Sequence, residues 1–190
     1  MSIICFIGKK GSGKSYNADL LLSIDPDVMK LSLATPLKQY CQKFFHQSVF
    51  SVSKDSIVQE DDIAEMPPGF NSHDRFTYRD VFIEISRRFK RSNPDFFADA
   101  LVSKIKGYGC DQTYVIDDLR FANELDALMR LPMKLTVVLI CDGKTLPSSD
   151  QSEDVATLIK EVERRHVSFF KLKDFNMRDH LASGSRLSRG

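Results

Sequence analysis

The chain has 190 residues, which is enough for one domain of ordinary size with its own hydrophobic core. Because 42% of the residues are apolar and 28% are charged, with 9 Gly and 7 Pro, the composition excludes disordered, collagenous and low-complexity proteins. The 27 Lys and Arg nearly balance the 26 Asp and Glu, so the net charge of +1 argues against a nucleic-acid polymer or an anionic membrane as partner.

The cysteine pattern and the N-terminal sequence bear on the cellular compartment. The four cysteines are far apart, with no CxxC pair and no histidine spaced to complete a zinc site. The N-terminus lacks the basic and apolar regions of a signal peptide, and no stretch approaches the roughly 20 apolar residues of a membrane span. We therefore expect reduced thiols and a cytoplasmic protein without membrane contact.

The first fifty residues predict two strands that alternate with two helices. An apolar run at 3–7 predicts a strand buried on both faces, as in a parallel sheet. Helical spacing over 14–24 predicts a helix, which an Asp-Pro pair ends. Residues 28–33 predict a second strand, and a Thr-Pro pair opens a second helix over 35–45.

The middle of the chain predicts a loop followed by two helices. Residues 51–76 are irregular and acidic, so we expect a partly looped excursion. Helices are predicted at 78–89 and, from an Asn-Pro start, at 93–105. We expect the region of about 51–110 to be a mobile insertion.

The last third of the chain returns to alternation. Strands are predicted at 114–116, 135–140 and 167–172, and helices at 123–131 and 153–163. This order predicts an α/β fold, a three-layer sandwich with helices around a mainly parallel central sheet. With no linker and no repeat, we expect one domain over the whole chain.

The glycine-rich turn after the first strand carries the clearest motif. Residues 8–15 read GKKGSGKS and match GxxxxGK[ST] between a buried strand and a helix, which is the context of a phosphate-binding P-loop. Its backbone N–H groups and the helix N-terminus favour a polyphosphate, while Lys14 is expected to reach the β- and γ-phosphates and Ser15 to ligate Mg²⁺. The expected nucleotide-binding residues are Gly8, Gly11, Ser12, Gly13, Lys14 and Ser15.

The P-loop indicates ATP and Mg²⁺ but not the reaction. A GTPase is disfavoured because no [NT]KxD guanine signature follows a hydrophobic strand, and motors or helicases need longer chains. The small size and the many internal arginines favour a small-molecule kinase, whose two anionic substrates must be held together.

A second informative segment, 115–124, reads VIDDLRFANE. An acidic residue at the end of a buried strand is where P-loop proteins hold Mg²⁺, and Arg120 follows Asp118 by two residues. Here the sequence resembles the deoxynucleoside monophosphate kinases of tailed phages and related viruses, which read D-V-R-F-x-N-E. Three further segments resemble that family in the same order: 32–38, 78–97 and 151–153.

This resemblance implies a P-loop NTPase fold of the nucleoside monophosphate kinase type. The implied reaction transfers the ATP γ-phosphoryl group to a deoxynucleoside 5'-monophosphate. The implied catalytic residues are Lys14, Arg79, Arg91, Asp118 and Arg120, and the implied Mg²⁺ ligands are Ser15 and Asp118. Asp117 is left without a definite role. The region of about 51–110 would bind the acceptor. The resemblance also implies a viral protein located in the host cytoplasm. It is compatible with a homodimer.

The chain departs from the family pattern at the lid expected over ATP, at about 142–152. Family members often carry an arginine after the preceding strand, whereas this chain has CDGK at 141–144. Lys144, Arg164 or Arg165 would have to replace it. Two alternatives therefore stay open: a P-loop kinase of another phosphorylated small molecule, and a catalytically weak viral structural or assembly protein with a kinase-like fold.

Overall fold

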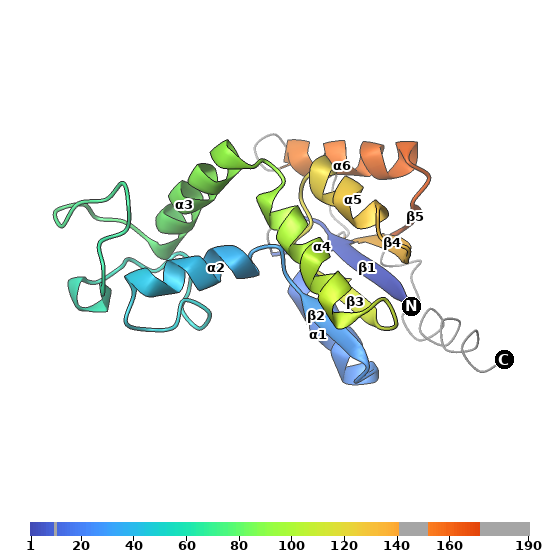
Figure 1. Ribbon diagram of the computed structural model, residues 1–190, viewed down its shortest axis with the longest axis horizontal. Helices are drawn as coiled ribbons and strands as arrows, with labels where there is room; N and C mark the ends of the chain where they lie inside the picture. Colours follow the sequence, from blue (N-terminus) through green and yellow to red (C-terminus); the bar gives the residue numbers. More distant parts are fainter. Residues whose placement is uncertain (10, 141–151, 172–190) are drawn as a thin grey trace. The chain divides into compact units, whose positions relative to one another are not determined.

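The computed structural model describes residues 1–9, 11–140 and 152–171, and the side chains of 152–154 are outside this description (Figure 1). The strands are β1 (Ser2–Ile7), β2 (Val28–Leu31), β3 (Thr113–Ile116), β4 (Lys134–Leu139) and β5 (Ser168–Lys171). The α-helices are α1 (Lys14–Ile24), α2 (Thr35–Cys41), α3 (Tyr78–Ser92), α4 (Phe96–Tyr108), α5 (Ala122–Met129) and α6 (Ser152–Arg164). Two 3-10 helices are η1 (Gln42–Phe44) and η2 (Glu60–Asp62). The predicted α/β alternation is therefore confirmed.

The five strands form one sheet in the order β2-β3-β1-β4-β5, and every neighbouring pair is parallel. Parallel pairing is what the chain order demands, because a helix or a longer segment separates each strand from the next and returns the chain to the same edge. The prediction of a mainly parallel sheet is thus confirmed, and the observed sheet is parallel throughout. The sheet's carboxyl edge carries the loops that follow β1 and β3.

Both faces of the sheet are buried, which explains the unbroken apolar runs of the strands. On one face, Ile4 and Phe6 of β1 pack with Ala18 and Leu21 of α1. On the other face, α5 and α6 lie next to each other (Figure 1). Arg165, directly after α6, donates a hydrogen bond to Asp126 of α5. This arrangement is compatible with the predicted three layers.

The chain divides into two compact units, where the sequence predicted one domain. Unit 1 comprises Met1–Leu33 and Ala98–Gly190, and unit 2 comprises Ala34–Phe97. The predicted insertion of about 51–110 therefore overlaps unit 2 only in part. Its last residues belong to α4, whose Leu101 and Ile105 are buried in unit 1. The inserted unit begins earlier than predicted because α2, directly after β2, already belongs to it.

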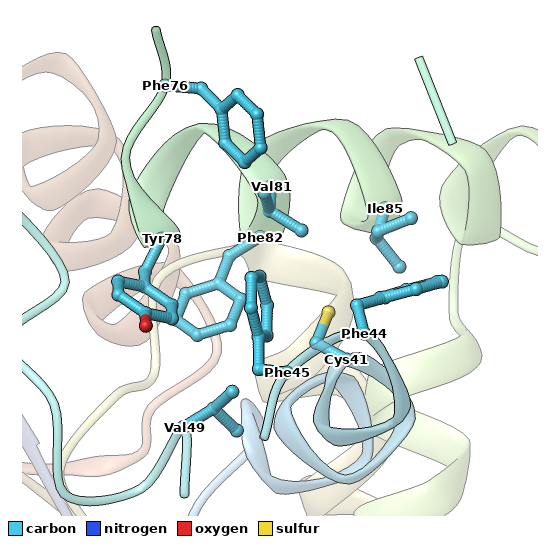
Figure 2. Close-up of a cluster of buried hydrophobic side chains, with 9 residues drawn as sticks. All are labelled: Cys41, Phe44, Phe45, Val49, Phe76, Tyr78, Val81, Phe82 and Ile85. Atoms are coloured by element: carbon cyan, nitrogen blue, oxygen red, sulfur yellow. The ribbon is translucent and has the colours of Figure 1, made fainter. Parts of the chain in front are cut away.

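Unit 2 has a hydrophobic core of its own, which Figure 2 shows. Aromatic side chains of the segment after α2 meet the apolar face of α3, and the Phe45 and Tyr78 rings lie 4.7 Å apart. The cluster comprises Cys41, Phe44, Phe45, Val49, Phe76, Tyr78, Val81, Phe82 and Ile85. Burial of this many apolar side chains gives unit 2 a source of stability separate from the sheet.

The acidic segment 51–76 is folded back onto that core rather than extended away from it. Isolated bridges pair Phe45 with Ile63 and Ile57 with Thr77. The Tyr78 hydroxyl accepts a hydrogen bond from Gln47 at 2.6 Å and donates one to Asp62 at 3.2 Å. In the parts of the chain described here, no helix combines the length and the apolar character needed to cross a membrane.

Candidate phosphate-binding site

The glycine-rich loop lies at the carboxyl end of β1 and depends on two of its glycines. Gly8 has a φ of +151°, and a Cβ atom there would lie 2.7 Å from the Ile140 carbonyl oxygen and 2.7 Å from Ser12 Oγ. Gly13 is the N-cap of α1 with a φ of +91°. Because L side chains rarely adopt these conformations, glycine at both positions is a structural requirement of the loop.

Lys14 begins α1 and folds back over the loop. Its Nζ donates hydrogen bonds to the carbonyl oxygens of Gly8 at 2.7 Å and of Lys9 at 2.6 Å. Burial and the nearby Arg120 guanidinium lower the pKa of Lys14, while the Asp117 carboxylate acts in the opposite direction. The lysine therefore lies in a partly desolvated site, where an anionic ligand would compensate for its lost hydration.

Two serine hydroxyls complete the loop. Ser12 Oγ is buried and makes no hydrogen bond to any residue that the structure describes. A buried hydroxyl without a partner is costly, so a ligand acceptor at this position would stabilise the loop. Ser15 lies in the first turn of α1 and is exposed. Together with the helix N-terminus, these donors are suited to phosphate oxygens.

The loops after β1 and β3 meet where the sheet changes direction. From β1 the chain runs through α1 to β2, beyond β3, whereas from β3 it runs through α5 to β4, beyond β1. The two neighbouring strands thus send their connections to opposite sides. Ligands of open α/β sheets bind at the carboxyl edge beside such a point. The glycine-rich loop and the segment after β3 occupy this position.

Asp117 is the acidic residue that faces α1 and the glycine-rich loop. It follows the end of β3, whose Val115 packs against α1. Asp117 Oδ2 lies 3.1 Å from Lys30 Nζ, which also contacts Asp19 of α1 at 2.8 Å. The charge interaction between Asp117 and Lys14 agrees with this orientation. The acid beside the loop is therefore Asp117.

Asp118, the residue assigned from the sequence, lies elsewhere. Its Oδ2 accepts a hydrogen bond from Ser32 Oγ at 2.6 Å, and its Oδ1 accepts one from the Leu33 backbone N–H at 2.9 Å. Burial, followed by the charges of Asp118 and Glu124, raises the pKa of Cys5, whose side chain points away from α1. Asp118 thus ties the end of β3 to the end of β2, which is a structural role.

Arg120 is exposed at the start of the segment that leads into α5. Its position is fixed through the backbone, because Glu124 Oε2 accepts hydrogen bonds from the N–H groups of Arg120 at 2.9 Å and Phe121 at 3.0 Å. Glu124 is only 6% exposed. This carboxylate reaches back from the third residue of the helix to its N-cap, as in half of a capping box. Arg120 and Glu124 are thus linked through the Arg120 backbone N–H.

Replacing Glu124 with alanine is expected to lower the free energy of unfolding by about 2 kcal/mol, because two backbone donors lose a buried acceptor. Urea unfolding followed by circular dichroism measures this change. The control is Glu163→Ala, which removes an exposed acid of α6 and should change stability by less than about 0.5 kcal/mol. Equal stability of the two variants would contradict the capping role.

Two predicted site arginines lie in unit 2, at opposite ends of α3. Arg79 Nε contacts Asp55 Oδ1 at 2.6 Å, and this ion pair raises the Arg79 pKa. Arg91 is exposed in the last turn of the helix. At a rise of about 1.5 Å per residue the two positions lie about 18 Å apart along the axis, and about a third of a turn around it. Both could contact one phosphate group only with their side chains extended along the helix towards each other, whereas Arg79 is held by Asp55.

Of the three residues considered as substitutes for a lid arginine, Arg164 and Arg165 are described by the structure and Lys144 is not. Residues 142–151, with Lys144, lie outside the described residues, as does Lys10 of the loop. Arg164 pairs with Glu161, and Arg165 pairs with Asp126 and Glu161. Arg164 ends α6, Arg165 follows it, and both precede β5, so they lie at the amino edge of the parallel sheet, opposite the glycine-rich loop. Neither is placed to replace a lid arginine.

The oxygen donors beside the loop fit Mg²⁺. This ion prefers oxygen ligands and is usually held by one or two protein groups together with substrate phosphates and water. The Ser15 hydroxyl and the Asp117 carboxylate are such groups, whereas the Asp118 carboxylate is bonded to Ser32 and Leu33 at the end of β2. No cluster of three or more His, Cys, Asp or Glu suited to a metal occurs among the described residues. Such a cluster is not required for Mg²⁺ held through phosphates.

Sequence reasoning missed Lys30 and gave Asp117 no role. A single lysine within the apolar strand VMKL was the available signal, because a charge in a buried strand needs a partner. No known protein family matches the chain, and no curated protein matches it. The site is therefore defined by its own geometry: a glycine-rich loop, Lys14, Arg120 and Asp117 at the carboxyl edge of β1 and β3.

Proposed function

We propose that this protein is a Mg²⁺-dependent P-loop phosphotransferase that moves the ATP γ-phosphoryl group to a deoxynucleoside 5'-monophosphate. The observation that carries the proposal is the position of Lys14, which folds back over a glycine-rich loop at the point where the sheet changes direction. A partly desolvated lysine at a helix N-terminus favours a polyanionic ligand. The resemblance to the phage kinases supplies the acceptor class.

The reaction requires alignment and charge neutralisation more than acid–base chemistry. An oxygen of the acceptor phosphate forms a bond to the γ-phosphorus, and the bond from that phosphorus to the β–γ bridging oxygen breaks, so that ADP leaves with the electron pair. The acceptor oxygen is already anionic and needs no strong base. Mg²⁺ held by Ser15 and Asp117 would supply neutralisation of the β- and γ-phosphate charge.

The residues of the loop would contribute in distinct ways. The N–H groups of the loop and the Ser12 hydroxyl would donate to phosphate oxygens. Lys14 would exchange its bonds to the Gly8 and Lys9 carbonyls for bonds to the phosphates, because charge-assisted bonds to an anion are stronger. Arg120 would stabilise the charge that develops during transfer.

Only one of the two α3 arginines is expected to serve the acceptor phosphate, given their separation along the helix. We expect either Arg79→Ala or Arg91→Ala, but not both, to raise the acceptor KM by at least about tenfold, the effect of losing a charge-assisted hydrogen bond. Steady-state kinetics with ATP saturating and the acceptor varied measures this. Arg88→Ala, which removes another half-exposed arginine of α3, is the control. Equal large effects from both arginines would contradict the geometry.

A coupled assay of ADP release tests the proposed function. The panel contains the common deoxynucleoside and ribonucleoside monophosphates, together with phosphomevalonate and dephospho-coenzyme A as other phosphorylated acceptors. We expect stimulation of ADP release by at least one deoxynucleoside monophosphate. Stimulation only by another acceptor would indicate a different P-loop kinase. ATP binding without stimulation by any acceptor would indicate a protein that keeps the kinase-like fold for another purpose.

A further inference from the structure

Lys30 links three elements around the candidate site. It is the charged residue of β2, and its Nζ lies 2.8 Å from Asp19 Oδ1 of α1 and 3.1 Å from Asp117 Oδ2 after β3. The Lys30 side chain is 27% exposed and the Asp117 side chain 10%. The inner pair is thus largely removed from water, whereas Asp19, at 64%, is open to it. The Lys30–Asp117 pair is therefore mostly buried, whereas the Lys30–Asp19 pair is open to solvent on the Asp19 side.

The ion pair between Lys30 and Asp117 lies in a largely buried position. Burial lowers the pKa of Lys30, but the hydrogen bonds to Asp19 and Asp117 outweigh burial and raise the pKa above its usual value. A carboxylate that is nine-tenths buried needs such a partner, because an unpaired charge at that depth is strongly unfavourable.

Asp117 interacts with two lysines that belong to different parts of the site. Lys14 belongs to the glycine-rich loop, whereas Lys30 belongs to a neighbouring strand and takes no part in the loop. A bond to one carboxylate oxygen restricts rotation of the group and so fixes where the carboxylate points. Groups that hold a metal-binding carboxylate in this way typically alter metal affinity or activity by 10- to 100-fold when they are removed.

We infer that Lys30 is a positioning residue, which holds the Asp117 carboxylate in the orientation that receives the Mg²⁺ of a bound nucleoside triphosphate. The inference rests on the proposed function, since it assigns Lys30 a role in that same site. Lys30 acts through Asp117 and not through the phosphates. Loss of the Lys30 charge should therefore change how nucleotide binding responds to Mg²⁺, while the affinity for nucleotide without metal stays the same.

The test measures binding of a fluorescent ATP analogue, once in EDTA and once across a Mg²⁺ series. Lys30→Met removes the charge at similar length, Lys30→Arg keeps it, and Asp19→Asn removes the outer partner only. Mg²⁺ is expected to enhance binding of the ATP analogue. We expect Lys30→Met to raise the Mg²⁺ concentration that gives half of this enhancement by roughly tenfold or more, while the affinity for the analogue in EDTA stays within about threefold of wild type. For Lys30→Arg and Asp19→Asn, both the half-maximal Mg²⁺ concentration and the affinity in EDTA should stay within about threefold of the wild-type values.

A double-mutant cycle separates positioning from general support of the fold. If Lys30 acts through Asp117, then adding Lys30→Met to Asp117→Ala should produce no further change in the Mg²⁺ response. This comparison also replaces the single variant if Lys30→Met alone fails to fold, because Asp117→Ala removes the charge that would be left unpaired. An additive effect of the two substitutions would overturn the inference.

Three further results would overturn it. The first is an unchanged Mg²⁺ response of folded Lys30→Met, and the second is equal loss in Lys30→Met and Lys30→Arg. The third is wild-type binding that does not respond to Mg²⁺, which would remove the metal role but leave nucleotide binding in place. Absence of nucleotide binding by the wild type, in EDTA and in Mg²⁺, would instead refute the proposed function itself and the inference with it.

Discussion

Replacing Lys14 with methionine is expected to lower kcat for ADP formation by at least about a hundredfold. The ammonium group is held at the loop by the carbonyl oxygens of Gly8 and Lys9, in a partly desolvated position beside Arg120. A partly desolvated charge at the loop stabilises the transferring group more than a fully solvated lysine would, once it exchanges these bonds for bonds to the phosphates. Loss of one such donor typically costs about 3 kcal/mol in the transition state.

The matched control for Lys14→Met is Lys134→Met. Lys134 is exposed at the first position of β4, so it lies at the amino edge of the sheet, opposite the loop. The two variants change the net charge equally. Steady-state kinetics should show full activity in the control within about twofold. Equal activity of the two variants, with both folded by circular dichroism, would show that the loop lysine has no part in turnover.

Asp117 and Asp118, adjacent in the chain, are expected to give opposite defects when each is replaced with alanine. Asp117→Ala should lower Mg²⁺-stimulated ADP formation by roughly 10- to 100-fold. The variant should remain folded, because Lys30 keeps Asp19 as a partner. Asp118→Ala should lower the free energy of unfolding by about 2 kcal/mol, because Ser32 Oγ and the Leu33 N–H lose their acceptor. Its turnover, measured well below the unfolding transition, should stay within about fivefold of wild type.

The pair of alanine variants decides which carboxylate serves the metal. Parallel measurements of the Mg²⁺ dependence of turnover and of urea unfolding are needed, because either measurement alone leaves the other role open. The reverse pattern would restore the assignment implied by the phage-kinase resemblance: loss of the Mg²⁺ response in Asp118→Ala and loss of stability in Asp117→Ala.

The choice between these two residues shows where sequence reasoning reached its limit. The strand TYVI and its neighbours were correctly predicted, since unbroken apolar runs between helices indicate buried parallel strands. For the same reason no alternation of polar and apolar residues revealed which face each side chain occupies. Only the pairing of Lys30 with Asp117, across 87 positions of the chain, fixes the orientation.

The division into two units was hidden for a related reason. The α2 and α3 helices carry the same apolar periodicity as helices that cover a sheet, and no linker-like composition marks Ala34 or Phe97. Their apolar faces turned out to pack on each other, around Phe44, Tyr78 and Ile85. By contrast, the start of α3 was predicted correctly, but the helix continues to Ser92, beyond the predicted end at residue 89, and so also sets the distance between Arg79 and Arg91.

The central claim is that the γ-phosphoryl group of ATP moves to a deoxynucleoside monophosphate, and its most direct test follows that group itself. The protein is incubated with Mg²⁺, γ-³²P-labelled ATP and each deoxynucleoside monophosphate, and the products are separated by thin-layer chromatography. We predict label in the deoxynucleoside diphosphate for at least one acceptor, and its loss in Lys14→Met. Label that stays in ATP, or appears only as inorganic phosphate with every acceptor, would contradict the claim.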